Sequence, residues 1–161
     1  MDIYLLRHGI AEEGRAGMRD ADRALTQEGR EKLRRVLKRA KAAGVTPALI
    51  LSSPYRRALQ TAEIAAESLA YRGRVVQTEA LVPNASPHDV WGEIRARRDE
   101  TSLLLASHEP LMSSTLALLL NSPALLVDMK KAALACVDCG RFGPEPHAVL
   151  KWLITPATAG E

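Results

Sequence analysis

Three short polar segments of this chain carry residue types that bind and transfer an anion. Arg7-His8-Gly9 follows the apolar run Ile3–Leu6, the pair Arg56-Arg57 comes shortly after a second apolar run, and Ser107-His108-Glu109 follows Leu103–Ala106. Arginine presents planar N–H donors that suit phosphate oxygens, and imidazole can act as a nucleophile, an acid or a base. A single Arg-His pair would indicate only a solvated turn, but three such segments predict a site for a phosphate-sized anion.

The apolar runs before these segments are typical of buried β-strands. Strand-like runs cover residues 3–6, 48–51, 75–77, 103–106, 133–137 and 148–154. Helices are expected after an N-cap at Thr26 as far as Gly44, from start signals at Ser53-Pro54 and Ser86-Pro87, and from Pro110 or Leu111 to residue 120. This alternation predicts a three-layer α/β/α fold, in which a mostly parallel sheet has an antiparallel edge strand after the turn Gly140–Pro144.

A mostly parallel sheet brings the polar segments together, because the carboxyl ends of parallel strands share one edge. We therefore expect Arg7, His8, Arg57 and His108 to meet in one crevice. Clustered cations repel one another unless an anion lies among them, and they stabilise a phosphoryl group during transfer. We also expect the surrounding positive charge to lower the pKa of His8, so that its neutral imidazole can attack phosphorus.

Other interpretations of the charged residues are open at this point. Each arginine of the Arg56-Arg57 pair could form a surface ion pair with Glu63 or Glu67 on the same predicted helix. His108 alone could be a strand-end histidine that is hydrogen-bonded to a loop. The basic stretch from Arg30 to Lys41 could contact RNA or an acidic protein, but such a run is more often a solvated helix face.

The composition is that of an ordinary globular protein, with 161 residues, 47% hydrophobic and 25% charged residues and a net charge of +3. This length fits a single domain over residues 1–161 that needs no stabilising disulfide or metal. No apolar stretch approaches the roughly 20 residues that span a bilayer, which predicts a cytoplasmic protein. Cys136 and Cys139 would point to opposite faces of a strand, so we interpret them as small apolar residues, with a metal or redox role as the alternative.

Four stretches of the chain, taken in order, form a known pattern. They are Arg7-His8-Gly9, Leu25-Thr26 with Gly29, the block Ser53–Ala62, and Ser107-His108. Together they resemble the motifs of the histidine phosphatase superfamily, which includes the phosphoglycerate mutases and the histidine acid phosphatases. Each stretch is weak alone, but four in this order, each in its strand or helix context, are specific. The resemblance implies a phosphoglycerate mutase-like fold.

The resemblance also implies a role for each matching residue. His8 is the nucleophile that becomes phosphorylated, and the phosphate pocket is formed by Arg7, Arg57 and His108. Alignment on the Arg-Ala-x-Gln-Thr portion of the second block selects Arg57 and not its neighbour Arg56.

Further residues are expected at the pocket. Gly9 would let the backbone or a substrate approach closely, and Ser53 would cap a helix whose N–H groups face the anion. Superfamily members that act on esters usually place a carboxylic acid beside the pocket, and Glu79 and Glu109 are the candidate general acids here. Neither lies in a distinctive motif. A missing acid would suit a phosphoramidate substrate, because its nitrogen leaves more readily than an alkoxide without a proton donor.

The whole chain is similar in length and layout to the short phosphohistidine phosphatases of bacteria, including its closing segment Trp152–Pro156. Those proteins resemble the superfamily core without the large cap insertion that covers the site in mutases. The implied function is hydrolysis of phosphohistidine on a signalling protein, such as a histidine phosphotransfer domain. We expect a monomer that needs no metal or cofactor and binds neither nucleic acid nor membrane. The alternatives are a phosphatase of small phosphate esters or sugar phosphates, and a non-catalytic phosphate-binding module.

Overall fold

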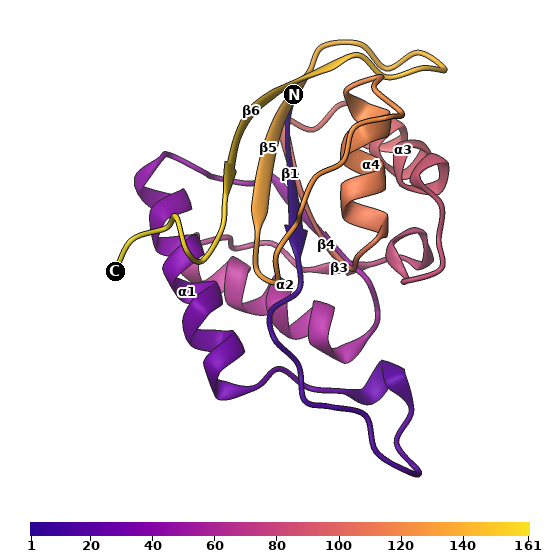
Figure 1. Cartoon of the computed structure of the whole chain (residues 1–161). Helices are drawn as coiled ribbons and strands as arrows, with labels where there is room; N and C mark the ends of the chain where they lie inside the picture. The colour runs from indigo at the N-terminus through magenta and orange to yellow at the C-terminus, as the bar shows by residue number, and fades with distance from the viewer.

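A six-stranded sheet in the order β3-β2-β4-β1-β5-β6 lies at the centre of the structure, a computed structural model that describes residues 1–161 (Figure 1). In chain order the strands are β1 (Asp2–Arg7), β2 (Leu49–Ser52), β3 (Val76–Gln77), β4 (Ser102–Ser107), β5 (Leu134–Cys139) and β6 (Ala148–Ile154). The helices are α1 (Gln27–Ala42), α2 (Arg56–Ser68), α3 (Pro87–Ala96) and α4 (Leu111–Leu119), with short 3₁₀ turns η1 (Asp20–Asp22) and η2 (Glu79–Leu81). None of these helices is long and apolar enough to cross a membrane.

The sheet is mostly parallel, as the alternation of strands and helices predicted. The strands β1 to β4 run in one direction, with β4 between β1 and β2. All residues of β4 are buried, which explains why Leu103–Ala106 reads as a continuous apolar run. Next to the edge strand β6, β5 runs antiparallel to both β1 and β6, so the predicted antiparallel pairing at this side of the sheet is confirmed.

Helices cover both faces of the sheet, which confirms the three-layer α/β/α fold (Figure 1). Leu104 of β4 packs with the apolar faces of α1 and α2, whereas its neighbours Leu103 and Leu105 pack with α3 and α4. Successive residues of a strand point to opposite faces, so one strand supports two core clusters. The same geometry places Cys136 and Cys139 in different clusters, on opposite faces of the sheet, as predicted.

Side-chain caps start two of the helices where the sequence predicted them. The Thr26 hydroxyl accepts a hydrogen bond from the Gly29 amide at 3.0 Å, and Ser86 forms a capping box at the start of α3. The predicted cap at Ser53 is wrong, since α2 begins only at Arg56, after a bend. Ser53 is buried and its hydroxyl contacts a histidine of another segment, which leaves α2 without a side-chain cap.

The segment between β1 and α1, residues 8–26, leaves the sheet, carries η1 and returns to the first turn of α1 (Figure 1). A β-carbon at Gly29 would overlap the carbonyl oxygen of Ile10, so this turn packs directly against the segment. Gly9 packs in turn against Gly29, whose carbonyl oxygen lies 3.1 Å from where a β-carbon of Gly9 would stand. The two glycines therefore hold the exit of β1 closely against α1.

Candidate active site

The polar segments that follow β1, β2 and β4 meet at one edge of the sheet, as the parallel topology predicted. Arg7 lies opposite Ser107 in the β1–β4 ladder, and Ser52 lies opposite Ala106 in the β2–β4 ladder. The three strands therefore end at the same level, and the residues that follow them enter one cluster. The buried polar residues that meet there are His8, Ser53, Arg57 and His108, and Arg7 lies beside them. We call this group the catalytic cluster, after the role that the sequence predicts for it.

His8 is the centre of the catalytic cluster, and a backbone contact fixes its tautomer. Its Nδ1 lies 2.7 Å from the carbonyl oxygen of Gly9, which can only accept a hydrogen bond, so Nδ1 carries the proton. The other nitrogen, Nε2, is therefore unprotonated, and its lone pair accepts a hydrogen bond from the Nε–H of Arg57 at 3.3 Å. The Gly9 amide donates to the Thr61 hydroxyl at 3.2 Å, which holds this turn in place. His8 thus presents an unprotonated nitrogen beside a guanidinium group, as a nucleophile for phosphorus requires.

Burial and positive charge keep both imidazoles of the cluster neutral. Burial is the main reason that the pKa of His8 falls to about 4; Arg57 and Arg7 lower it too, while the backbone hydrogen bond opposes them. The pKa of His108 falls to about 3, again mainly through burial and then through the charges of His8 and Arg57. The two ring centroids are 5.1 Å apart in an edge-to-face arrangement. At neutral pH His8 is therefore in its nucleophilic form.

Arg57 lies in the first turn of α2 and is held by a residue of η1. Its Nη1 and Nη2 donate to the backbone oxygen and the carboxylate of Asp20, at 2.8 and 3.0 Å. The alternative of an ion pair with Glu63 or Glu67 is wrong for Arg57, because its ion pair is with Asp20 at 3.0 Å. Glu67 pairs with Arg34 instead, at 3.3 Å. The arginine that precedes Arg57 is exposed, so the structure places the second arginine of the pair beside His8.

Arg7 and His108 complete the polar lining, and each has a buried nitrogen without a hydrogen-bond partner. Arg7 donates from Nη1 to the carbonyl oxygen of Met129 at 2.7 Å, whereas its Nε has no partner. His108 has its Nε2 at 2.8 Å from the Ser53 hydroxyl, whereas its Nδ1 has no partner. A buried polar atom that lacks a partner costs roughly 1–3 kcal/mol. The oxygens of a bound anion can accept from the Nε–H of Arg7, and also from Nδ1 of His108 in the tautomer in which this nitrogen carries the proton, so these groups fit an oxyanion.

Two residues that no sequence pattern assigns to the site, Tyr55 and Asp20, also line the cluster. The ring of Tyr55 lies 5.2 Å from that of His108, and the guanidinium carbon of Arg57 lies 5.2 Å from the same tyrosine ring. Asp20 accepts a hydrogen bond from Arg23 at 2.9 Å in addition to those from Arg57. The spacing of Asp20 and Arg23 is the one signal that the sequence offered, and it does not indicate a contact with α2.

The two candidate general acids lie in different surroundings. Glu109 is half-buried, and its Oε1 accepts a hydrogen bond from the Ser113 amide at 2.7 Å, in the first turn of α4. Burial lowers the pKa of Arg7, and the nearby charge of Glu109 opposes this effect. Glu79 is exposed at the start of η2, and its side chain forms no hydrogen bond. Of the two carboxylates, only Glu109 is close enough to the cluster for its charge to raise the pKa of Arg7.

We predict that His8 and His108 stay neutral in acid well below the usual range of histidine. An NMR titration of the ring nitrogens should give midpoints near pH 4 and pH 3, instead of about 6.5. The spectrum of a His108→Ala variant should retain only the His8 transition of the two, which assigns the signals. A His8 midpoint near pH 6.5 would contradict the burial and charge described above.

The same lowered pKa values make the fold less stable in mild acid. Between about pH 6.5 and pH 4 the unfolded histidines bind protons that the folded His8 and His108 do not, so the unfolded state binds more protons. The free energy of unfolding should therefore decrease as the pH falls through this window. Above the window both histidines are neutral in the folded and the unfolded state, so they add no pH dependence. Thermal unfolding at pH 7 and pH 5 measures the effect, which should be smaller in His108→Ala.

Comparisons with known proteins identify a family that the chain resembles. The chain matches the Histidine phosphatase superfamily (branch 1) over residues 3–82, which include His8 and Arg57. An uncharacterized protein of Picosynechococcus sp. is 35% identical over 111 residues, which make up 68% of this chain and 67% of that protein.

Solved structures extend the likeness over almost the whole chain. The protein histidine phosphatase SixA, complexed with tungstate, matches with a TM-score of 0.85 and 26% identity, covering 98% of each chain. A mycobacterial glucosyl-3-phosphoglycerate phosphatase shares the fold, with a TM-score of 0.68 and 19% identity, covering 93% of this chain and 96% of that one. From the ordered motifs, the sheet topology and the family match together, we conclude that the chain belongs to the histidine phosphatase superfamily.

Proposed function

We propose that this protein is a phosphatase that removes phosphate from phosphohistidine on a signalling protein, through a phosphorylated His8. The observation that carries the proposal is the Nε2 lone pair of His8, which faces Arg57 at 3.3 Å inside a buried cationic cluster. The cluster supplies a nucleophile together with cations that stabilise a phosphoryl group in transfer. The likeness to the protein histidine phosphatase SixA supports a protein substrate.

In the first step Nε2 of His8 forms a bond to phosphorus while the bond from phosphorus to the substrate imidazole breaks. The substrate ring keeps the electron pair of that bond, and it leaves as neutral imidazole when its other nitrogen carries a proton. No general acid is then needed, whereas an ester would release an alkoxide that requires one. Arg7 and Arg57 balance the charge on the phosphoryl oxygens during this step.

In the second step water attacks the phosphorus of phospho-His8, the bond between phosphorus and Nε2 breaks, and inorganic phosphate forms with both protons of the water. His8 regains its lone pair and keeps the proton on Nδ1. Phosphorylation makes the ring cationic, and the Gly9 carbonyl, which already accepts from Nδ1 at 2.7 Å, stabilises that charge. The backbone contact therefore supports the intermediate as well as the starting tautomer.

The direct test compares hydrolysis of a phosphorylated histidine phosphotransfer domain with hydrolysis of a panel of small phosphate esters and sugar phosphates. We expect kcat/KM for the phosphotransfer domain to exceed that of the best ester by at least about a hundredfold, because only the ester requires an acid. A comparable kcat/KM on an ester would contradict the proposed substrate and would favour a small phosphate ester instead. Binding of the phosphorylated domain without any turnover would instead identify a non-catalytic phosphate-binding module.

A phosphatase of small phosphate esters is the second candidate, and the position of Glu109 favours it. The carboxylate lies close enough to Arg7 to act on that residue's pKa, against the effect of burial. The mycobacterial glucosyl-3-phosphoglycerate phosphatase also shares the fold. An acid at this position could protonate the oxygen of a leaving alkoxide.

We expect Glu109→Gln to change phosphohistidine turnover by less than about threefold, because the leaving imidazole needs no acid. Glu79→Gln removes an exposed carboxylate and is the matched control. Steady-state rates on the phosphotransfer domain and on the best ester measure both variants. A sharp loss of ester turnover in Glu109→Gln, with phosphohistidine turnover preserved, would identify Glu109 as the general acid of the second candidate function.

A further inference from the structure

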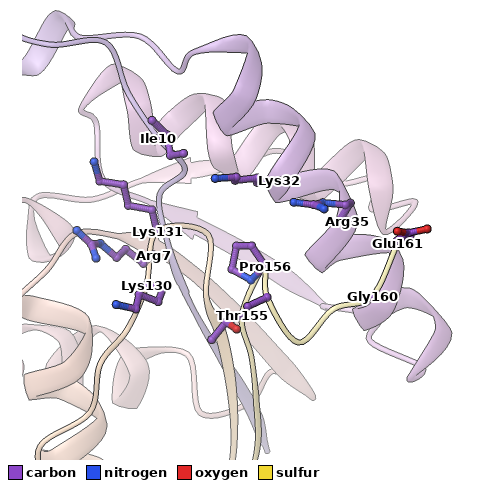
Figure 2. Close-up of a pocket in the computed structure, with 11 residues that line it drawn as sticks. Arg7, Ile10, Lys32, Arg35, Lys130, Lys131, Thr155, Pro156, Gly160 and Glu161 are labelled. Carbon is purple, nitrogen blue, oxygen red and sulfur yellow. The ribbon is translucent and has the colours of Figure 1, made fainter.

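A cleft lined mainly by cations lies beside the catalytic cluster and shares Arg7 with it. The cleft has a volume of about 750 Å³, and its charged lining residues are Arg7, Lys32, Arg35, Lys130, Lys131 and Glu161. Figure 2 shows Lys32 and Arg35 on α1 at one side of the cleft and the pair Lys130-Lys131 with Arg7 at the other. With five basic side chains and one acidic one, the cleft concentrates positive charge next to the reacting histidine.

Part of this charge has no partner within the protein. Lys32 and Lys130 form ion pairs with acids of their own segments, at 2.7 Å each. Arg35 and Lys131, in contrast, have no ion-pair partner, although both line the cleft. These two cations stand on opposite sides of the cleft and are available to carboxylates of another molecule (Figure 2).

A short loop, residues 129–132, lines the cleft and also contacts Arg7 and His8. The Met129 carbonyl accepts from Arg7 at 2.7 Å, and the Ala132 amide donates to the His8 carbonyl at 3.1 Å. Between them, Lys130 and Lys131 of the same loop line the cleft. A molecule that fills the cleft therefore lies directly beside the group that reacts at His8.

The burial of the cluster indicates what kind of molecule this is. His8 is only 7% exposed and Arg57 only 5%, so a phosphohistidine reaches them as a side chain that protrudes from its carrier. The surface of the carrier around that side chain then rests on the rim, which includes the cleft. The Lys130 side chain is 65% exposed, whereas a site for one small anion gathers buried donors around it. Exposed cations on separate elements instead suit carboxylates that are spread over a protein surface.

We propose that the cleft binds an acidic patch of the partner protein, next to its phosphorylated histidine. This inference rests on the proposed function and names the recognition surface that belongs to it. Carboxylates of the partner pair with Arg35 and Lys131, and the field of the cleft steers the encounter. Selection of the partner is thus separate from catalysis: it depends on α1 and the 129–132 loop, while the chemistry depends on His8.

The test is a charge reversal in the cleft, Lys32→Glu with Arg35→Glu, at positions outside the catalytic cluster. Arg30→Glu with Lys41→Glu is the matched control, because it makes the same change in net charge on the same helix and neither residue lines the cleft. We expect the cleft variant to lose about tenfold or more in kcat/KM on a phosphorylated histidine phosphotransfer domain at low salt, through KM. High salt should reduce the difference, and turnover of free phosphohistidine should be unchanged.

A binding measurement decides the proposal independently of turnover. A fluorescein-labelled oligoglutamate peptide should bind the wild type and the control variant, and fail to bind the cleft variant. If the wild type hydrolyses no phosphohistidine, the proposed function fails. The binding of oligoglutamate then tests, on its own, whether the cleft binds acidic groups. Equal losses of peptide binding in the cleft variant and the control variant, or no loss in either, would overturn the proposal. The proposal would also be overturned if the cleft variant lost turnover only on sugar bisphosphates. That result would assign the cleft to the second phosphate of a small substrate.

Discussion

A His8→Ala variant is expected to lose phosphatase turnover by at least about a thousandfold, because it lacks the atom that forms the bond to phosphorus. The other donors of the cluster stay in place and should still bind phosphate. Steady-state rates on the phosphorylated histidine phosphotransfer domain measure the loss. His88→Ala is the control, since this histidine is exposed on α3, and it should keep the wild-type rate.

The intermediate itself can be trapped on His8. A rapid quench of the wild type in alkali, which preserves phosphohistidine, should yield a phosphorylated peptide that contains residue 8 when digested and weighed by mass spectrometry. The same experiment on His8→Ala should yield none. Full activity of His8→Ala, or phosphate found on His108 alone, would contradict the proposed mechanism.

Arg57→Ala is expected to lower kcat/KM by about a hundredfold or more, by analogy with the loss of other donors that stabilise a transition state. The guanidinium group is buried and its Nε lies 3.3 Å from Nε2 of His8, so the substitution removes the cation in direct contact with that nitrogen. Its removal should also raise the pKa of His8 above about 4, since the charge of Arg57 contributes to lowering it after burial. Steady-state kinetics and the NMR titration of His8 measure the two effects.

Arg56→Ala is the matched control for this substitution. Arg56 precedes Arg57 in α2 but is exposed, and removal of an exposed arginine should leave both the rate and the His8 titration close to wild type. If Arg56→Ala were the more damaging of the two, the assignment of Arg57 to the phosphate pocket would be wrong.

The fold was predictable where local pattern and burial agree. The run Leu103–Ala106 indicates a strand buried on both faces, and β4 lies in the interior of the sheet. Thr26 marked the start of α1, because its hydroxyl caps the helix without help from distant residues. Arg7, His8 and His108 were predictable as neighbours for a different reason: they follow parallel strands directly, so the topology alone brings them together.

The remaining features of the site depend on contacts between distant segments, which no local pattern records. Ser53 before a proline is typical of a helix start, but its hydroxyl accepts from the Tyr55 amide at 3.2 Å and contacts His108 at 2.8 Å, while α2 begins only at Arg56. Asp20 lies in the segment 8–26, which has no periodicity that would fix its path to Arg57. The contact of Arg7 with Met129 is made by a backbone carbonyl, a group that every residue has.

The ion pair between Asp20 and Arg57 has a consequence for the end of the catalytic cycle. Asp20 binds Nη1 and Nη2 of the guanidinium group, and its side chain is 57% exposed, so inorganic phosphate must compete with a carboxylate that is held nearby. When the product departs, this carboxylate is the counterion of a cation that would be costly to leave buried alone. If Arg57 binds the phosphoryl group as proposed, product release exchanges one oxygen ligand of Arg57 for another, and we expect the nearby carboxylate of Asp20 to weaken product inhibition.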